Sequence, residues 1–202
     1  MNQTKKNLPA EKRRALTVET MISLAGEQNP SEITTAAIAQ RMGLTQGAIF
    51  RHFPSKDAIL QAAMDWVAQR LISRSEEATS AACSPLASLE GLFLFHAEFI
   101  ASHPGIPRML FGELQHPEDR IPKRMAQAIM ARYKESLRTL LHRGRDCGEL
   151  DEGLDVEAAA TLFIGALQGL VVQSMIAGDG SRVRHDAPLI FALYRRGLRR
   201  MA

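Results

Sequence analysis

The stretch that decides the fold is residues 33–53, which read ITTAAIAQRMGLTQGAIFRHF. Thr34 or Thr35 can cap a short helix with its hydroxyl, and Thr45 can cap a second helix of about two turns. Gly43 stands between them, where glycine can take the left-handed backbone angles of a sharp turn. Apolar residues recur at helical spacing on both sides of this turn, at Ile38, Ala39, Met42, Leu44, Ile49 and Phe53. The stretch therefore predicts a helix-turn-helix whose second helix is presented outward.

The residues that face away from this apolar set suit the major groove of DNA. The groove is about 12 Å wide, so a helix that enters it needs small or hydrogen-bonding residues at its front. Gln46 can bond an adenine edge with both amide atoms, and Arg51 can bond a guanine edge or a phosphate. Gly47 and Ala48 permit close approach. A small three-helix core whose glycine turn has no functional meaning would show the same apolar pattern, so the pattern alone leaves DNA binding open.

The rest of the chain is predicted to be helical as well, because no segment shows two-residue alternation or an Asn-Gly hairpin signal. We expect an all-α protein with about nine helices, the further ones at about 9–25, 56–82, 86–102, 106–115, 122–145, 155–176 and 187–201. Gly26 is expected to end the first of these. The helix that starts near Lys56 should join two domains. These are a three-helix DNA-binding domain over 1–55 and a helical ligand-binding and dimerisation bundle over 56–202.

The surplus of positive charge lies in the same part of the chain as the predicted helix-turn-helix over 33–53, which we call the reader. The 202 residues carry a net charge of +3, and residues 1–60 hold eight basic against five acidic side chains, so the whole surplus lies there. A polyanion would bind at such an end. A basic cluster near the N-terminus can add nonspecific phosphate contacts: Lys5, Lys6, Lys12, Arg13 and Arg14.

Several classes of protein are disfavoured by what the sequence lacks. The two cysteines, Cys83 and Cys147, lie far apart, which argues against a disulfide framework and favours a reducing cytoplasm. No uninterrupted apolar run reaches the roughly 18 residues of a membrane span, and the N-terminus lacks a signal-peptide pattern. There is no Gly-rich phosphate loop, no nucleophile elbow and no metal-ligand spacing. We therefore expect no membrane contact, no enzymatic activity, no metal and no cofactor.

Several short motifs between residues 33 and 60 match the pattern of a known protein family: Thr34-Thr35, Ile38-Ala39, Gly43-Leu44-Thr45, Gly47-Ala48-Ile49-Phe50 and Phe53-Pro54-Ser55-Lys56-Asp57-Ala58-Ile59-Leu60. They resemble the DNA-binding domain of the tetracycline-repressor (TetR/AcrR) family of bacterial transcription regulators. With the first helix included, the resemblance covers about 50 residues. It implies phosphate contacts from Thr35, Phe50, His52 and Lys56. It implies base reading by Thr45, Gln46, Gly47 and, in some members, Arg51.

The sequence departs from the family pattern at two positions. Phe50 stands where many members have tyrosine, so a hydroxyl contact to phosphate is absent. Ala36 stands where some members have an arginine that reaches a base, so base reading should rest on the second helix. Together, pattern and resemblance predict these DNA-binding residues: Thr34, Thr35, Thr45, Gln46, Gly47, Ala48, Phe50, Arg51, His52 and Lys56.

A ligand pocket is expected in the bundle, where the helix over 86–102 is apolar nearly all round and should lie centrally. Methionine and aromatic residues suit an adaptable apolar pocket. The candidates are Met64, Trp66, Phe93, His96, Phe99, Met109, Phe111, Met130, Tyr133, Phe163 and Gln168. Plain core packing is the commoner explanation of such a stripe, and for His96 a hydrogen bond to a core neighbour is favoured over a ligand or metal contact.

The last two helices are expected to form a homodimer interface as a four-helix arrangement with their symmetry mates. Burial within the monomer should account for part of each apolar face. The predicted interface residues are Phe163, Leu167, Leu170, Val171, Met175, Leu189, Leu193 and Tyr194. The terminal arginines after Tyr194 are expected to form a solvated edge.

These expectations describe a cytoplasmic, ligand-responsive transcription regulator. We expect it to act as a repressor that binds a palindromic operator in double-stranded DNA as a homodimer. Its effector would be a small apolar or amphipathic molecule. Two alternatives remain open: an architectural or nucleoid-associated DNA binder without an effector, and a helical carrier of an apolar molecule.

Overall fold

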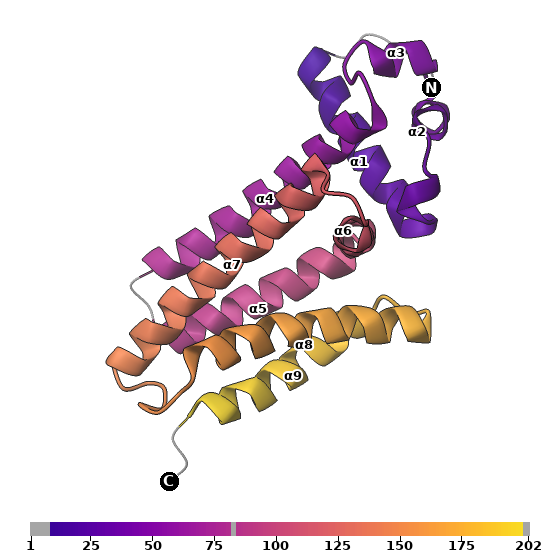
Figure 1. The fold of residues 1–202 in the computed structure, drawn as a ribbon. Coiled ribbons are helices and arrows are strands. Elements are labelled where there is room, and N and C mark those ends of the chain that lie inside the picture. The colour runs from indigo at the N-terminus through magenta and orange to yellow at the C-terminus, as the bar shows by residue number, and fades with distance from the viewer. Residues whose placement is uncertain (1–8, 82–83, 200–202) are drawn as a thin grey trace. The chain divides into compact units, whose positions relative to one another are not determined.

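The computed structural model describes residues 9–81 and 84–199, and within them it contains nine α-helices, one short 3-10 helix and no strand. The predicted all-α class is confirmed (Figure 1). The elements are α1 (Ala10–Glu27), η1 (Pro30–Glu32), α2 (Thr35–Met42), α3 (Gln46–Phe50), α4 (Lys56–Ser80), α5 (Pro85–Ser102), α6 (Gly105–Gln115), α7 (Ile121–Asp146), α8 (Val156–Ala177) and α9 (Arg182–Leu198). Some residues named above lie outside the described part of the chain: Lys5, Lys6, Cys83 and the end of the predicted last helix at 200–201.

The chain divides into two compact units. Of the described residues, those from 9 to 67 and from 103 to 127 form unit 1, and those from 68 to 102 and from 128 to 199 form unit 2. Helices α4 and α7 therefore contribute to both units, and α6 belongs to unit 1. This division reflects packing. The predicted functional boundary after residue 55 stays a prediction.

In unit 1, α1 packs against both α2 and α6, and the contact with α6 is unusually close. A Cβ atom on Gly105 would lie 2.0 Å from the backbone oxygen of Ile22. One on Gly26 would lie 3.3 Å from Cγ of Pro104. The expectation that Gly26 ends the first helix is wrong, because α1 continues to Glu27. Glycine at this position instead lets the start of α6 approach α1.

In unit 2, α8 and α9 lie side by side, and α5 packs against both (Figure 1). Aromatic side chains fill the space between them: the Phe93 and Phe163 ring centroids are 5.1 Å apart, and those of Phe93 and Phe191 are 5.4 Å apart. The predicted start of the last helix was wrong. It begins at Arg182, five residues earlier than expected, because Val183 is already buried in the same core.

Helix α8 is, within the described residues, the one helix long and apolar enough to cross a membrane by length and composition. Its apolar character is explained in part by the core of unit 2. The side chains buried there are Val156, Ala159, Ala160, Phe163, Leu167, Leu170 and Val171.

Candidate DNA-binding site

The turn between α2 and α3 forms through local hydrogen bonds. Thr34 caps α2, its hydroxyl oxygen accepting a hydrogen bond of 3.1 Å from the Ala37 amide. Gly43 has φ 70° and ψ 32°, the left-handed region where a side chain would cost energy. The Leu44 amide then donates to the backbone oxygen of Ala39 at 2.9 Å, which closes the end of α2. These contacts are the ones expected of a glycine-ended helix followed by a sharp turn.

Helix α3 is short and is held by its inner face. Thr45 caps it, accepting a hydrogen bond of 3.3 Å from the Ala48 amide. Ile49 is fully buried and Phe53, just beyond the helix, is 1% exposed, so both lie inward as predicted. Phe50 is 46% exposed, one of the few large apolar side chains left at the surface of unit 1.

The outer side of α3 is open. Gln46, Gly47 and Arg51 are exposed, and Ala48 and His52 are half-buried. A Cβ added to Gly47 would meet nothing within 4 Å, apart from the helix itself and its chain neighbours. Helix α3 therefore has no side chain at its second residue, Gly47, and this allows its backbone to approach a DNA groove closely.

Two residues predicted to contact DNA are bonded to each other. The Gln46 side-chain amide donates a hydrogen bond of 2.7 Å to the hydroxyl of Thr35. Thr35 is only 9% exposed, so its predicted phosphate contact has little surface with which to form. Its evident role in this conformation is to orient Gln46.

Lys56 is also held within the chain. Its ammonium group donates to the backbone oxygens of Pro30 at 3.0 Å and Ser31 at 2.7 Å. Burial, followed by the nearby positive charge of Arg120, lowers the pKa of Lys56 below its ordinary value. The predicted phosphate contact of Lys56 thus stays a prediction, and the structure adds that this lysine joins α4 to η1.

Arg14 contributes a contact that sequence reasoning missed. It was counted among the residues of a basic cluster, but its guanidinium donates to the backbone oxygen of His52 at 2.5 Å and lies 4.3 Å from the ring centre of Phe53. Arg14 therefore supports the chain just after α3 from α1. Its partners are nearly forty residues away, and no local pattern in the sequence signals the pairing.

The residues predicted to line a ligand pocket are distributed over both units. Met64, Trp66, Met109 and Phe111 belong to unit 1, and the others belong to unit 2. In unit 2, Phe93 and Phe163 are fully buried, and Phe99 is 6% exposed. Met130 is half-buried and Gln168 is exposed. A ligand contact at any of these residues stays a prediction.

His96 and Tyr133 form the polar pair of this core. The Nδ1 atom of His96 and the hydroxyl of Tyr133 are joined by a hydrogen bond of 3.0 Å. Burial lowers the pKa of His96 to about 4 and raises the pKa of Tyr133. His96 is therefore neutral at ordinary pH and hydrogen-bonded to a core neighbour, the role that the sequence favoured.

The residues predicted for the dimer interface divide into two groups. Phe163, Leu167, Leu170, Val171 and Tyr194 are buried within the chain's own core, each at most 7% exposed. Met175, Leu189 and Leu193 are exposed at 48%, 59% and 61%. Three further exposed side chains were not in the predicted set: Leu162, Val172 and Ile176. The outward face of α8 is thus the one opposite to most of the residues predicted.

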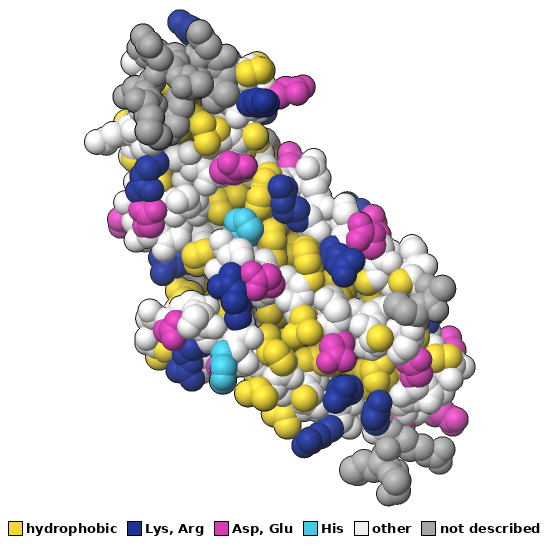
Figure 2. Space-filling view, turned by 180° about the vertical axis from the view of Figure 1, so that it is seen from behind, with side chains coloured by type: hydrophobic (Ala, Val, Ile, Leu, Met, Phe, Trp, Pro, Cys, Tyr) yellow, Lys and Arg dark blue, Asp and Glu magenta, His cyan; other side chains and the backbone are white. Residues whose placement is uncertain are grey.

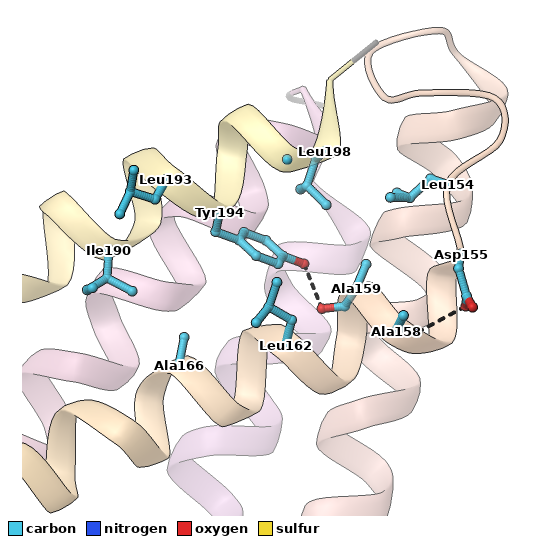
Figure 3. A pocket seen from close by; sticks show the side chains of 11 residues that line it. Leu154, Asp155, Ala158, Ala159, Leu162, Ala166, Ile190, Leu193, Tyr194 and Leu198 are labelled. Carbon is cyan, nitrogen blue, oxygen red and sulfur yellow. Dashed lines mark hydrogen bonds between the residues drawn. The ribbon is translucent and has the colours of Figure 1, made fainter. Parts of the chain in front are cut away.

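A groove of about 410 Å³ lies along this exposed face between α8 and α9. Figure 3 shows Leu162 and Ala166 of α8 opposite Ile190 and Leu193 of α9, all reaching into it. At one end the Tyr194 hydroxyl donates to the backbone oxygen of Ala159 at 3.0 Å, which joins the two helices beneath the groove.

Comparison with known proteins gives two family matches within the chain. Residues 19–63 match the model of bacterial regulatory proteins of the tetR family, and residues 112–187 match a tetracyclin repressor-like C-terminal domain. Among curated relatives, the nucleoid occlusion factor SlmA of Shewanella woodyi is 32% identical over 159 residues, covering 73% of this chain and 75% of that protein. SlmA of Vibrio cholerae is 27% identical over 151 residues, covering 72% and 74%.

Solved structures share the fold. The TetR-family regulator PfmR of Thermus thermophilus has a TM-score of 0.76 and 23% identity, over 92% of this chain and 96% of that one. The regulator FadR of Bacillus subtilis, solved with stearoyl-CoA, has a TM-score of 0.75 and 19% identity, over 91% and 98%. Fold, family matches and identity agree: the chain belongs to the tetR family of bacterial regulatory proteins, and it is a DNA-binding regulator.

Proposed function

We propose that this protein is a ligand-responsive repressor that binds a palindromic operator as a homodimer and reads it with α3. The observation that carries the proposal is the open outer side of α3. Gln46, Gly47 and Arg51 are exposed at a capped helix that follows a left-handed glycine, and Gln46 is held there by its hydrogen bond to Thr35. Small and hydrogen-bonding residues at this place suit entry into a major groove.

Selection of bound fragments from a random DNA library tests this reading. The full-length protein should enrich a two-fold symmetric sequence whose half-sites are about one helical turn, 34–36 Å, apart. Gln46→Ala should lose the preference at one position in each half-site. Gln40→Ala is the matched control, because Gln40 is exposed on α2. Enrichment of sequences without symmetry, or the same preference in Gln46→Ala, would reject the assignment.

Dimerisation is supported by the exposed apolar face of α8 and α9. Leu162, Ile176 and Leu193 are each at least 60% exposed, and exposed apolar patches of this kind mark protein interfaces. On the face in Figure 2, hydrophobic side chains reach the surface in strips between basic and acidic ones. A second copy of the chain would cover such an α8–α9 face through an isologous contact, because the same patch meets itself across a two-fold axis.

The proposal of an effector draws on ligands bound by structural relatives. Structural relatives include FadR, solved with stearoyl-CoA, and SmeT, solved with triclosan. Stearoyl-CoA is amphipathic, with a long apolar acyl chain, and triclosan is largely apolar. For this chain we propose a small apolar or amphipathic effector that reaches the aromatic core of unit 2, beside Phe93, His96 and Phe163. The protein would act in the cytoplasm, where its DNA lies.

A second candidate function is favoured by the curated relatives. Several of them bear the name nucleoid occlusion factor SlmA, which supports a DNA binder that acts on the nucleoid. In this alternative the protein has no small-molecule effector. A thermal-shift screen with long-chain acyl compounds separates the two functions, because a ligand that binds the folded state raises the melting temperature. A hit that also lowers operator affinity supports the repressor, and a screen without any such hit supports the effector-free alternative.

A further inference from the structure

Unit 1 contains a cavity that shares no lining residue with the groove between α8 and α9. It measures about 260 Å³, just below the roughly 300–1,000 Å³ of sites for drug-sized ligands. Its walls come from η1, the first turn of α4, and α6 with the residues that follow it. Met109, which is among the residues predicted for the apolar pocket, lines this cavity. Most of the lining is polar or charged: Asn29, Ser31, Lys56, Asp57, Arg108, Glu113, His116 and Arg120.

Glu113 has an unmet hydrogen-bonding need. The residue is only 8% exposed, and its Oε2 atom is buried without a hydrogen-bond partner. Its other carboxylate oxygen lies 3.7 Å from a guanidinium nitrogen of Arg120. A buried carboxylate oxygen without a donor costs free energy, so such atoms are nearly always satisfied by protein, water or ligand. A molecule in the cavity that donates a hydrogen bond would relieve this cost.

The three cationic side chains of the cavity differ in their partners. Arg120 pairs with Asp57 as well as approaching Glu113. By contrast, Lys56 donates to backbone oxygens of η1, and Arg108 donates to the backbone oxygen of Gly26 at 3.0 Å. The lining thus has three cationic side chains, Lys56, Arg108 and Arg120, and two carboxylates. This surplus of cations favours a carboxylate, and Lys56 and Arg108 have the chemistry to bind one.

We propose that this cavity is a binding site for a small zwitterion, a molecule with an ammonium group for Glu113 and a carboxylate for Lys56 and Arg108. An ammonium alone would meet three cations, and a carboxylate alone would leave the oxygen of Glu113 unpaired. A molecule with both groups can donate a hydrogen bond to Glu113 and accept hydrogen bonds from Lys56 and Arg108. The inference concerns ligand binding by unit 1 and is independent of how α3 reads DNA.

Gly112 provides a direct way to close the cavity. It lines the cavity from α6, and a Cβ placed on it would meet nothing within 4 Å beyond the helix itself and its neighbours. Gly112→Leu should therefore fill the space without displacing the fold. Gly91→Leu is the matched control, since Gly91 lies inside α5, far along the chain from the cavity, with the same open space around its Cβ position.

Thermal unfolding of the full-length protein, without DNA, tests the proposal with a panel of zwitterionic amino acids as probes. At least one should raise the melting temperature of the native protein by about 5 °C at a concentration a hundredfold above its dissociation constant. Gly91→Leu should keep that rise and Gly112→Leu should lose it. Glu113→Gln should weaken binding of the same probe about tenfold or more, because a charge-assisted hydrogen bond is lost.

Matched probes test the chemical class. The carboxylic acid that lacks the ammonium group, and the amine that lacks the carboxylate, should each stabilise the native protein less than the zwitterion does. The proposal is overturned if no amino acid raises the melting temperature, if the rise survives in Gly112→Leu, or if either matched probe works equally well. Glu113→Gln keeps the size of the side chain, so it tests the site even if Gly112→Leu does not fold. Native affinity for the probe in Glu113→Gln would also overturn the proposal.

Discussion

Gln46, the first residue of α3, donates its side-chain amide to the hydroxyl of Thr35, the first residue of α2, across 2.7 Å. The bond joins the two helices of the reader at their N-terminal ends. It uses a donor of Gln46 and leaves the carbonyl oxygen of that side chain outside the bond. A glutamine oriented in this way loses less rotamer freedom when it meets a base edge, which favours a defined contact.

Gln46→Ala should relax base preference at one operator position by about 1–3 kcal/mol. Thr35→Val keeps the shape of the side chain but removes the acceptor, so it should weaken the same preference by a smaller amount. In the double variant, Thr35→Val should add almost nothing to this preference, because the two residues act through one contact. Affinities over a randomised operator library measure all three. Fully additive effects would show that the Thr35 bond does not orient Gln46.

The two glycines of the reader should respond oppositely to alanine. Gly43→Ala should lower the free energy of unfolding by about 1–2 kcal/mol, because φ is 70° there and a side chain is strained in that region. Gly47→Ala should raise it by about 0.5–1 kcal/mol, because Gly47 lies within α3 and its Cβ position is open. Urea denaturation measures both values.

Although Gly47→Ala should stabilise the fold, it should bind DNA less tightly than the native protein does. The added methyl group of Gly47→Ala lies on the side of α3 that we propose enters the groove, so operator affinity should fall about tenfold, equivalent to about 1.4 kcal/mol. A variant that gains stability and keeps full affinity would place Gly47 outside the DNA interface.

Local signals predicted the reader well, and they failed where distant contacts decide the structure. The caps Thr34 and Thr45 and the turn at Gly43 act within a few residues, so the sequence contains their whole cause. By contrast, Gly26 continues α1 because α6 packs against it, and Arg14 supports His52 from far along the chain. Neither partner is visible in a local pattern.

Helix α8 shows a different limit of sequence reasoning. It is apolar on two faces, with Phe163 and Leu167 on one and Leu162 and Ile176 on the other. The periodicity of the sequence indicates that both faces are apolar, but it does not indicate which of them is buried in the chain's own core. That choice is made by α5 and α9, which cover the face of Phe163. The predicted interface set therefore mixed core residues with exposed ones.

Leu193→Asp should convert the proposed dimer to a monomer. Leu193 is 61% exposed in α9 and reaches the groove beside α8, so a partner would bury a charge without compensation (Figure 3). The dimer dissociation constant should rise about a hundredfold, measured by sedimentation equilibrium. Ile121→Asp is the control, because Ile121 is 50% exposed outside this face and should leave the association unchanged. A dimer of native strength in Leu193→Asp would place the interface elsewhere.

Buried His96 should make the protein less stable in mild acid. Its pKa is about 4 in the folded state, compared with about 6.5 in an unfolded chain, so between these values the unfolded state binds more protons. The contribution is fully present above about pH 6.5 and is lost as the pH falls towards 4. Because His96 keeps some exposure, we expect the loss to be about 2 kcal/mol.

Urea denaturation at several pH values between 4 and 7 measures this effect. The native protein should lose stability across the window, and His96→Gln, which cannot be protonated there, should lose about 2 kcal/mol less. The control variant is His185→Gln, which removes an imidazole that is 80% exposed, and its slope is compared with those of the native protein and of His96→Gln. Equal slopes of stability against pH in the native protein and in His96→Gln would contradict this prediction. They would mean that His96 is protonated as easily in the folded core as in the unfolded chain, and that its hydrogen bond to Tyr133 does not depend on a neutral ring.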